Sequence, residues 1–190
     1  MRVSCAIIVY GPIGSGKTCT CLSLAEMARA EGLPAGGILS PRVYRGGELV
    51  GYDGLDPSTG EVFPLVRLRS RVEGSEWFVF GRLRYAFSTP GFERANLILT
   101  RSAEEMSRLS IVFVDEFGRL EGSNRGIYAG ASRVAEALRE GGVSVFTCRG
   151  DMVQAVEGLL RGRAQAVLRR EPGGAEAMWR FIRGCAARAG

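Results

Sequence analysis

The sequence predicts an α/β fold: a mostly parallel sheet flanked by helices, with a small antiparallel β-hairpin insert. Apolar, β-branched runs alternate with helical patterns over most of the 190 residues, which is typical of a parallel sheet with helices on both faces. The motif G-x-x-x-x-G-K-T directly follows the first apolar run, and a later run ends on two adjacent acids. We expect a single domain over residues 1–190, with the insert at residues 37–85.

The first strand and the first helix follow from their apolar patterns. Val3–Tyr10 is a nearly continuous apolar run, as in a strand buried on both faces. A helix is expected from Lys17 to about Ala30, because Leu22, Ala25 and Ala28 recur on one of its faces. A glycine and then a proline follow it, and both are signals that end a helix.

The segment after the first helix has short strand patterns separated by turn residues, which predicts the insert. Strand patterns at Gly37–Arg45 and Glu48–Asp53 flank the pair Gly46-Gly47, which predicts a β-hairpin. Glu61–Leu68 would add the third strand of a meander, and Trp77–Arg82 another short strand.

The second half of the chain alternates further core strands with helices. Core strands are expected at Ile111–Val114, Val143–Cys148 and Ala164–Leu168. Helices are expected from Thr89 to before Leu109, and over Asn124–Glu140, Asp151–Leu160 and Ala175–Ala187.

The composition excludes several classes of site. The chain has no histidine, which excludes Ser-His-Asp and Cys-His catalysis and leaves general-base work to a carboxylate, Lys, Tyr or Cys. The net charge of +5 suits nucleoside phosphates or a weak affinity for nucleic acid, and a solvated basic surface explains it equally well. We expect a monomer that has no membrane partner.

The cysteines and the apolar runs indicate a cytoplasmic protein. The five cysteines lack metal-ligand spacing, and their odd number argues against a disulfide framework, which suits a reducing cytoplasm. No apolar run approaches the roughly 20 residues of a membrane-spanning helix. The first strand begins near Val3, which leaves no room for a signal peptide.

The glycine-rich motif predicts a phosphate-binding loop between a strand and a helix. Its glycines allow the loop to turn its N–H groups inward around anionic oxygens, and the helix adds its positive N-terminal end. Lys17 offers a mobile charge to the β- and γ-phosphates, and the Thr18 hydroxyl is an oxygen ligand suited to Mg²⁺. The predicted nucleotide-binding residues are Gly11, Pro12, Ile13, Gly14, Ser15, Gly16, Lys17, Thr18 and Cys19.

Two acids at the end of the strand 111–114 predict the second half of the site. Asp115 stands where such proteins keep the acid that orients Mg²⁺. Glu116 follows it and is the best candidate for the base that activates a water behind the γ-phosphate. Thr147, at the end of another core strand, is a candidate for contact with the γ-phosphate or that water. Possible electrostatic clamps are Arg82, Arg84, Arg94, Arg119 and Arg149.

These motifs together resemble the THEP1-type nucleoside-triphosphatases. The matching segments are GPIGSGKT at residues 11–18, the block from Gly37 to Glu61, Gly81-Arg82 with Phe92-Glu93, and Asp115–Glu121. Leu83 is a departure, since the family pattern tends to have Tyr there. The resemblance implies a RecA-like P-loop NTPase core and slow, Mg²⁺-dependent hydrolysis of nucleoside triphosphates, with broad base tolerance. It also implies that Lys17 and Thr18 bind phosphate and Mg²⁺, that Asp115 orients the metal and that Glu116 activates water.

Two alternative functions stay open at this point. A nucleotide or nucleic-acid kinase would transfer the γ-phosphoryl group to an acceptor hydroxyl, for which the insert could supply a pocket. A P-loop adaptor or switch would bind nucleotide in order to control a partner. The adjacent pair Asp115-Glu116 disfavours the switch, which needs no base of its own.

Overall fold

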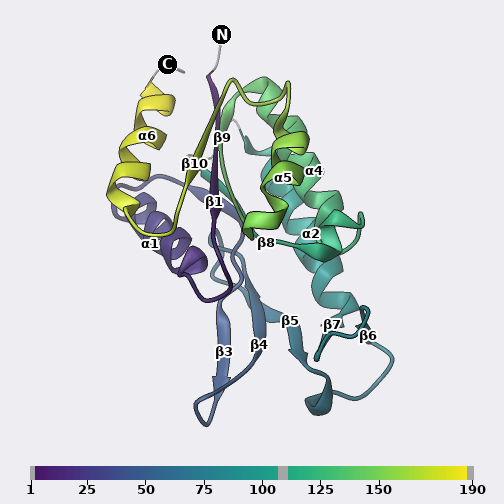
Figure 1. Cartoon of the computed structure of the whole chain (residues 1–190). Helices are drawn as coiled ribbons and strands as arrows, with labels where there is room; N and C mark the ends of the chain where they lie inside the picture. Colours follow the sequence, from purple (N-terminus) through teal and green to yellow (C-terminus); the bar gives the residue numbers. More distant parts are fainter. Residues whose placement is uncertain (1–2, 107–110, 188–190) are drawn as a thin grey trace.

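A five-stranded parallel sheet forms the core of the protein (Figure 1). The structure is a computed structural model that describes residues 3–106 and 111–187. Across the sheet, the strands are β10 (Ala166–Arg170), β1 (Ser4–Tyr10), β9 (Gly142–Cys148), β8 (Ile111–Phe117) and β2 (Ala35–Ile38). All four neighbouring pairs are parallel, which confirms the predicted fold class. The strand β9 lies between the strand before the glycine-rich loop and the strand that ends in the two acids.

Helices cover both faces of this sheet, as Figure 1 shows. The helices α1 (Lys17–Ala30) and α6 (Ala175–Ala187) lie on one face, and α2 (Thr89–Glu104), α4 (Tyr128–Ala137) and α5 (Val153–Leu160) lie on the other. Each face has its own buried apolar cluster. None of the described helices is long and apolar enough to cross a membrane.

One predicted helix is packed as expected and another has the wrong bounds. In α1, Leu22, Ala25 and Ala28 pack against one apolar cluster, in which Ala28 is fully buried together with Cys21 and Leu24. The segment 124–140 is not one helix: α4 begins at Tyr128 and a 3₁₀ turn, η3 (Leu138–Glu140), follows it. A short helix, α3 (Arg119–Gly122), precedes that segment directly after β8.

An antiparallel sheet projects beyond the carboxyl edge of the core sheet (Figure 1). Its order is β3 (Arg42–Arg45), β4 (Glu48–Leu55), β5 (Val62–Leu68), β7 (Tyr85–Ser88) and β6 (Trp77–Val79). The expected hairpin across Gly46-Gly47 is confirmed by the antiparallel pairing of β3 with β4. The strand β7, which runs directly into α2, has no counterpart among the predicted strands.

The prediction that Gly37 and Ile38 belong to the hairpin is wrong, because both lie in the core strand β2 and pair in parallel with β8. The strand has glycine at two of its four positions, so it shows no apolar pattern of its own. Gly37 has a φ of 92°, and a Cβ placed on it would lie 2.0 Å from the carbonyl oxygen of Phe113. Only glycine fits such a close approach of two backbones.

Cys5 and Cys185 form a disulfide, which the odd number of cysteines did not predict. Cys5 lies in β1 and Cys185 in α6, and both are buried in the same apolar cluster. The residues are 180 positions apart in sequence, and only the packing of α6 against the first strand brings them together. Among the described residues, Cys19, Cys21 and Cys148 are free. The cytoplasmic location stays a prediction.

We expect the pair Cys5→Ser and Cys185→Ser to lower the free energy of unfolding by about 2–4 kcal/mol, because it releases a very long closed loop in the unfolded chain. Urea unfolding of the wild type with a reducing agent should match this double variant without one. The exposed thiol of Cys19 is the matched control, and Cys19→Ser should leave the midpoint unchanged. A wild-type midpoint that is insensitive to reduction would show that the disulfide does not stabilise the fold.

Candidate active site

The loop at residues 11–16 connects β1 to α1 at the carboxyl edge of the core sheet. Gly14 and Gly16 have φ angles of 87° and 93°, and residues with a side chain rarely adopt such angles. A Cβ on Gly11 would lie 2.7 Å from the Ser15 hydroxyl. The helix α1 starts without a side-chain cap, so its first N–H groups are available to an anion.

Lys17 folds back over this loop, where its ammonium donates hydrogen bonds to the carbonyls of Gly11 (3.0 Å) and Pro12 (2.9 Å). The residue is buried, with 4% of its surface exposed. The Ser15 hydroxyl is also buried and has no hydrogen-bond partner among the described residues. Pro12, Ile13, Gly14 and Cys19 are exposed, and Gly11, Ser15, Gly16 and Thr18 are partly buried. A buried cation and an unpaired hydroxyl in a concave loop suit a polyanionic ligand.

Asp115 is fully buried at the end of β8 and organises a network of hydrogen bonds. Its carboxylate accepts hydrogen bonds from the backbone N–H of Ser40 (2.8 Å), the Thr147 hydroxyl and the backbone N–H of Glu116 (3.1 Å). Burial raises the pKa of Asp115, while the hydrogen bonds from Thr147, Ser40 and Thr18 oppose that rise. The network joins the ends of β2, β8 and β9 with the start of α1, which fixes the position of the carboxylate.

Thr147 does not face the pocket in this structure. Its side chain is fully buried, and its hydroxyl donates to Asp115 while it accepts from the backbone N–H of Glu116 (2.9 Å). The hydroxyl therefore contacts the two acidic residues, where a γ-phosphate or an attacking water was expected. Thr147 has the geometry of a residue that positions both acids.

Glu116 sits at an irregularity in the sheet. The pairing of β8 with β9 shifts register between Val114 and Phe117, and Glu116 has a φ of 62°. A positive φ in a residue other than glycine costs of order 1–3 kcal/mol and is concentrated at functional sites. The shift frees the backbone N–H of Glu116 from the ladder and turns its side chain into the pocket, where it is exposed.

The surroundings of Glu116 raise its pKa to about 7. Although the side chain is open to the pocket, the surrounding protein atoms displace much of the water around its carboxylate. This desolvation is the largest cause of the raised pKa, followed by repulsion from Asp115. The positive charges of Lys17 and Arg42 act in the opposite direction. A carboxylate with a pKa near neutrality is suited to accept a proton at physiological pH.

Arg42, at the start of β3, is a residue that the sequence did not single out. A Cβ placed on Gly14 would lie 3.5 Å from its guanidinium Nη2, so the guanidinium lies over the phosphate-binding loop. It donates a hydrogen bond to the Tyr44 hydroxyl (3.3 Å) and lowers the pKa of Glu116. The signal was available in principle, since Arg42 follows the carboxyl end of a core strand once β2 is placed in the sheet.

Only two of the five predicted arginine clamps reach this site. Arg119 and Arg149 line a cavity together with Asp115 and Glu116. The other candidates are engaged elsewhere or do not line the cavity: Arg94 pairs with Glu61, Arg84 lies over the ring of Tyr85, and Arg82 is exposed on the insert.

Glu121 stabilises the loop that follows the acids. Its carboxylate is buried and accepts hydrogen bonds from the backbone N–H groups of Gly118 (2.8 Å) and Ile127 (3.0 Å). A Cβ placed on Gly126 would lie 2.1 Å from that carboxylate, so the chain passes close to it. Asn124 and Gly126 have φ angles of 57° and 63°, which interrupt the helical path between α3 and α4. Glu121 itself lines the cavity next to the two acids.

Thr18 and Asp115 fit a magnesium ion by the chemistry of their oxygens. Mg²⁺ is usually bound through one or two carboxylates, several waters and the phosphates of the substrate. The described residues contain no group of three or more His, Cys, Asp or Glu side chains arranged around one metal position, so a cage made by the protein alone is not present among them. A single buried carboxylate beside the Thr18 hydroxyl matches the first arrangement.

Comparisons with known proteins identify the family of this chain. The family model described as NTPase matches residues 6–167. The nucleoside-triphosphatase THEP1 of Methanopyrus kandleri is 30% identical over 131 residues, which are 69% of this chain and 67% of that protein. A cancer-related nucleoside-triphosphatase homolog of Bos taurus is 30% identical over 118 residues, or 60% of each protein.

Two solved structures share the fold. The solution structure of a human cancer-related nucleoside triphosphatase has a TM-score of 0.68 at 21% identity, with 100% of both chains covered. The crystal structure of THEP1 from Aquifex aeolicus has a TM-score of 0.66 at 19% identity, with 94% of this chain and 96% of that chain covered. Because the family model spans most of the sequence, the chain belongs to the THEP1-type NTPase family.

Proposed function

We propose that the protein is a Mg²⁺-dependent nucleoside-triphosphate phosphohydrolase, which converts NTP and water to NDP and phosphate. The observation that carries the proposal is the convergence of Lys17, Asp115 and Glu116 at one edge of the sheet, where the charge of Lys17 acts on the Glu116 carboxylate. The names of the relatives in Methanopyrus kandleri and Bos taurus support the same reaction class.

In this proposal the chain binds the triphosphate through the loop and Lys17, and it moves one proton. Lys17 leaves the carbonyls of Gly11 and Pro12 and binds the β- and γ-phosphate oxygens, while the N–H groups of the loop bind the rest. Glu116 accepts the proton of the water that attacks the γ-phosphorus. When bound, Mg²⁺ neutralises charge on the β- and γ-phosphates. Thr18 and Asp115 would hold the ion, and Thr147 keeps both acids in position.

The nucleoside end of the substrate has a separate place beside the loop. A hollow of about 650 Å³ adjoins the glycine-rich loop on the side of the chain that follows β10. It is lined by Tyr10, Gly11, Pro12, Ser15, Arg149, Gly150, Asp151, Glu171 and Pro172. We propose broad base tolerance, because the loop contacts phosphates only and the hollow is large. We also propose a monomeric, cytoplasmic protein.

A turnover panel tests this function. ATP, GTP, CTP and UTP should each release phosphate and the matching diphosphate with Mg²⁺, and none should do so with excess chelator. Chelator should also weaken the binding of a non-hydrolysable triphosphate, which is a readout separate from activity. Absence of metal-dependent turnover with every nucleotide would refute the proposal.

Arg42 is proposed to stabilise charge that develops on the γ-phosphoryl oxygens. Arg42→Ala should lower kcat about tenfold, because one ion pair near a protein surface is worth about 1–4 kcal/mol and Arg42 is exposed. Arg42→Lys should restore part of the loss. Removal of this charge should also raise the apparent pKa of kcat/KM, because Arg42 lowers the pKa of Glu116.

Arg45 is the matched control, since it is an exposed arginine at the other end of the same strand. Arg45→Ala should change neither kcat nor the pH profile. Equal effects of the two alanine variants would mean that Arg42 acts through the general charge of the insert and not at the γ-phosphate.

A further inference from the structure

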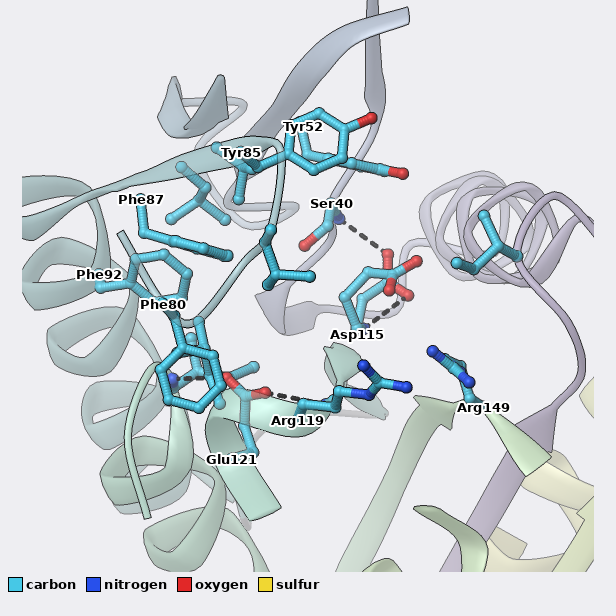
Figure 2. Close-up of a pocket in the computed structure, with 18 residues that line it drawn as sticks. Ser40, Tyr52, Phe80, Tyr85, Phe87, Phe92, Asp115, Arg119, Glu121 and Arg149 are labelled. Carbon is cyan, nitrogen blue, oxygen red and sulfur yellow. Dashed lines mark hydrogen bonds between the residues drawn. The ribbon is translucent and has the colours of Figure 1, made fainter. Parts of the chain in front are cut away.

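An aromatic cavity of about 250 Å³ lies between the insert and the core, directly beside the two acids. Figure 2 shows the rings of Phe80, Phe87 and Phe92 on one side of it. The guanidinium groups of Arg119 and Arg149 lie on the other side (Figure 2). Aromatic rings and guanidinium groups therefore lie across the cavity from one another, and the Glu121 carboxylate lies near the ring of Phe80 (Figure 2).

The walls of the cavity come from segments far apart in the sequence. The insert contributes Tyr52, Tyr85 and Leu83, and the ring centroids of the two tyrosines lie 6.0 Å apart. Phe87 on β7 and Phe92 on α2 lie with their ring centroids 6.1 Å apart. Packed rings of this kind form a wall of defined shape, so the cavity is a preformed feature of the fold.

Hydrolysis alone does not need a space of this size. A water molecule takes about 30 Å³ in the liquid, so the cavity has room for about eight, whereas the proposed reaction uses one. The nucleoside of the substrate does not need it either, because the hollow of about 650 Å³ beside Pro172 is available to it. The cavity is open to a second molecule that meets the γ-phosphate next to Glu116.

We propose that this cavity binds a small aromatic alcohol whose hydroxyl replaces water as the acceptor of the γ-phosphoryl group. The proposal rests on the proposed function, since it uses the same triphosphate and the same base. Aromatic and apolar walls select a ring. Glu116, Arg119 and Arg149 line the cavity together with Ile13 of the phosphate-binding loop, and Glu121, Tyr52 and Tyr85 add polar groups elsewhere in its wall. Because the proposal places the γ-phosphate at the loop, the hydroxyl of the ligand faces Glu116 there. A cavity of this volume and polarity does not suit a nucleotide or a nucleic acid as the acceptor.

The bonds, electrons and proton of the transfer are all accounted for by the alcohol, the triphosphate, Glu116 and solvent. The hydroxyl oxygen of the alcohol forms a bond to the γ-phosphorus, and the bond from that phosphorus to the β–γ bridging oxygen breaks. The electron pair of the broken bond leaves with the NDP. The hydroxyl proton passes to the carboxylate of Glu116 and from there to solvent. The products are a phosphate monoester and NDP, and no redox partner is required.

Fluorine NMR of 4-fluorobenzyl alcohol tests both binding and transfer. The protein with Mg²⁺ and a non-hydrolysable triphosphate should broaden the probe resonance saturably. With Mg²⁺ and ATP, a new resonance of 4-fluorobenzyl phosphate should appear. The amount of ADP formed in excess of free phosphate should equal the amount of this monoester. 4-Fluorotoluene, which lacks the hydroxyl, should bind without product, and glycerol should not compete.

Two tryptophan variants locate the binding site. Leu83→Trp places a large ring into the cavity and should weaken probe binding at least tenfold. Val79→Trp is the control: Val79 is 39% exposed on the same insert and does not line the cavity, so this variant should bind the probe like the wild type. Thermal unfolding of each variant reports whether it is folded.

The possible outcomes separate this inference from the proposed function. Absence of saturable binding, binding that Leu83→Trp leaves unchanged, or binding without formation of the monoester would each overturn the inference. In all three cases, phosphate release from ATP in the absence of the alcohol would still support the hydrolase. If no phosphate is released without the alcohol and the monoester forms with it, the proposed hydrolysis is overturned and the acceptor site stands.

Discussion

Glu116→Gln is expected to lower kcat by about 10²–10⁴-fold, the usual contribution of a general base. The amide keeps the shape of the side chain, so we expect the backbone φ of 62° at this position to stay the same, and the substitution removes only the ability to accept a proton. Binding of ATP should stay within about twofold of the wild type, because Glu116 contacts the water and not the phosphates in the proposed mechanism. Single-turnover kinetics and a separate titration with a fluorescent nucleotide measure the two quantities.

The pH profile provides a second readout of Glu116. The pKa of Glu116 is raised to about 7, and the reactive form is the carboxylate. The value of kcat/KM should therefore rise with pH through about 7, reach a plateau above it, and fall as the pH drops below it. The residual activity of Glu116→Gln should not show this rise of kcat/KM with pH.

Glu26→Gln is the matched control, since Glu26 is an exposed carboxylate on α1. It should keep the wild-type rate and the wild-type pH profile. Unchanged turnover in Glu116→Gln would remove this residue from the mechanism, and a preserved rise near pH 7 would assign that titration to another group.

Lys17→Ala is expected to lower kcat by about 10²–10³-fold, the effect of removing one preorganised donor from a developing charge. Unlike Glu116→Gln, it should also weaken triphosphate binding about tenfold or more, because one charge interaction worth about 1–4 kcal/mol is lost in the ground state. Stopped-flow phosphate release and calorimetric titration with a non-hydrolysable triphosphate separate the two effects.

Lys17 is the only lysine of the chain, which permits a direct test without mutation. Bound ATP should protect its side-chain amine from acylation, as measured by mass spectrometry of the peptide that contains it. Arg29→Ala, which removes an exposed charge from the last turn of the same helix, should leave binding and turnover unchanged. Acylation at equal rates with and without ATP would exclude contact between Lys17 and the phosphates.

The glycine-rich loop and the acid pair were predictable because each is encoded in consecutive residues. An apolar run that ends in acids also marks the carboxyl end of a core strand, which is where β8 places Asp115. The hairpin across Gly46-Gly47 follows from a local turn signal in the same way.

The features that the sequence did not predict share one physical origin, which is contact between segments far apart in the chain. The strand β2 has no apolar alternation, and its place in the sheet depends on the close approach of Gly37 to Phe113. With β2 misplaced, neither Ser40, which binds Asp115, nor Arg42 could be assigned to the site. The disulfide between Cys5 and Cys185 could not be predicted for the same reason, because only the packing of α6 on the sheet brings the two residues together.

The sequence by itself determined the chemistry on offer: a loop for phosphates, one lysine, an acid for a metal and an acid for a proton. The tertiary structure decided the arrangement. It turned Glu116 into the pocket through a shift in register, engaged the Thr147 hydroxyl between the two acids, and enclosed an aromatic cavity beside them. Short motifs specify local backbone and residue type, whereas the distances between side chains on different strands depend on how the whole sheet and its insert pack.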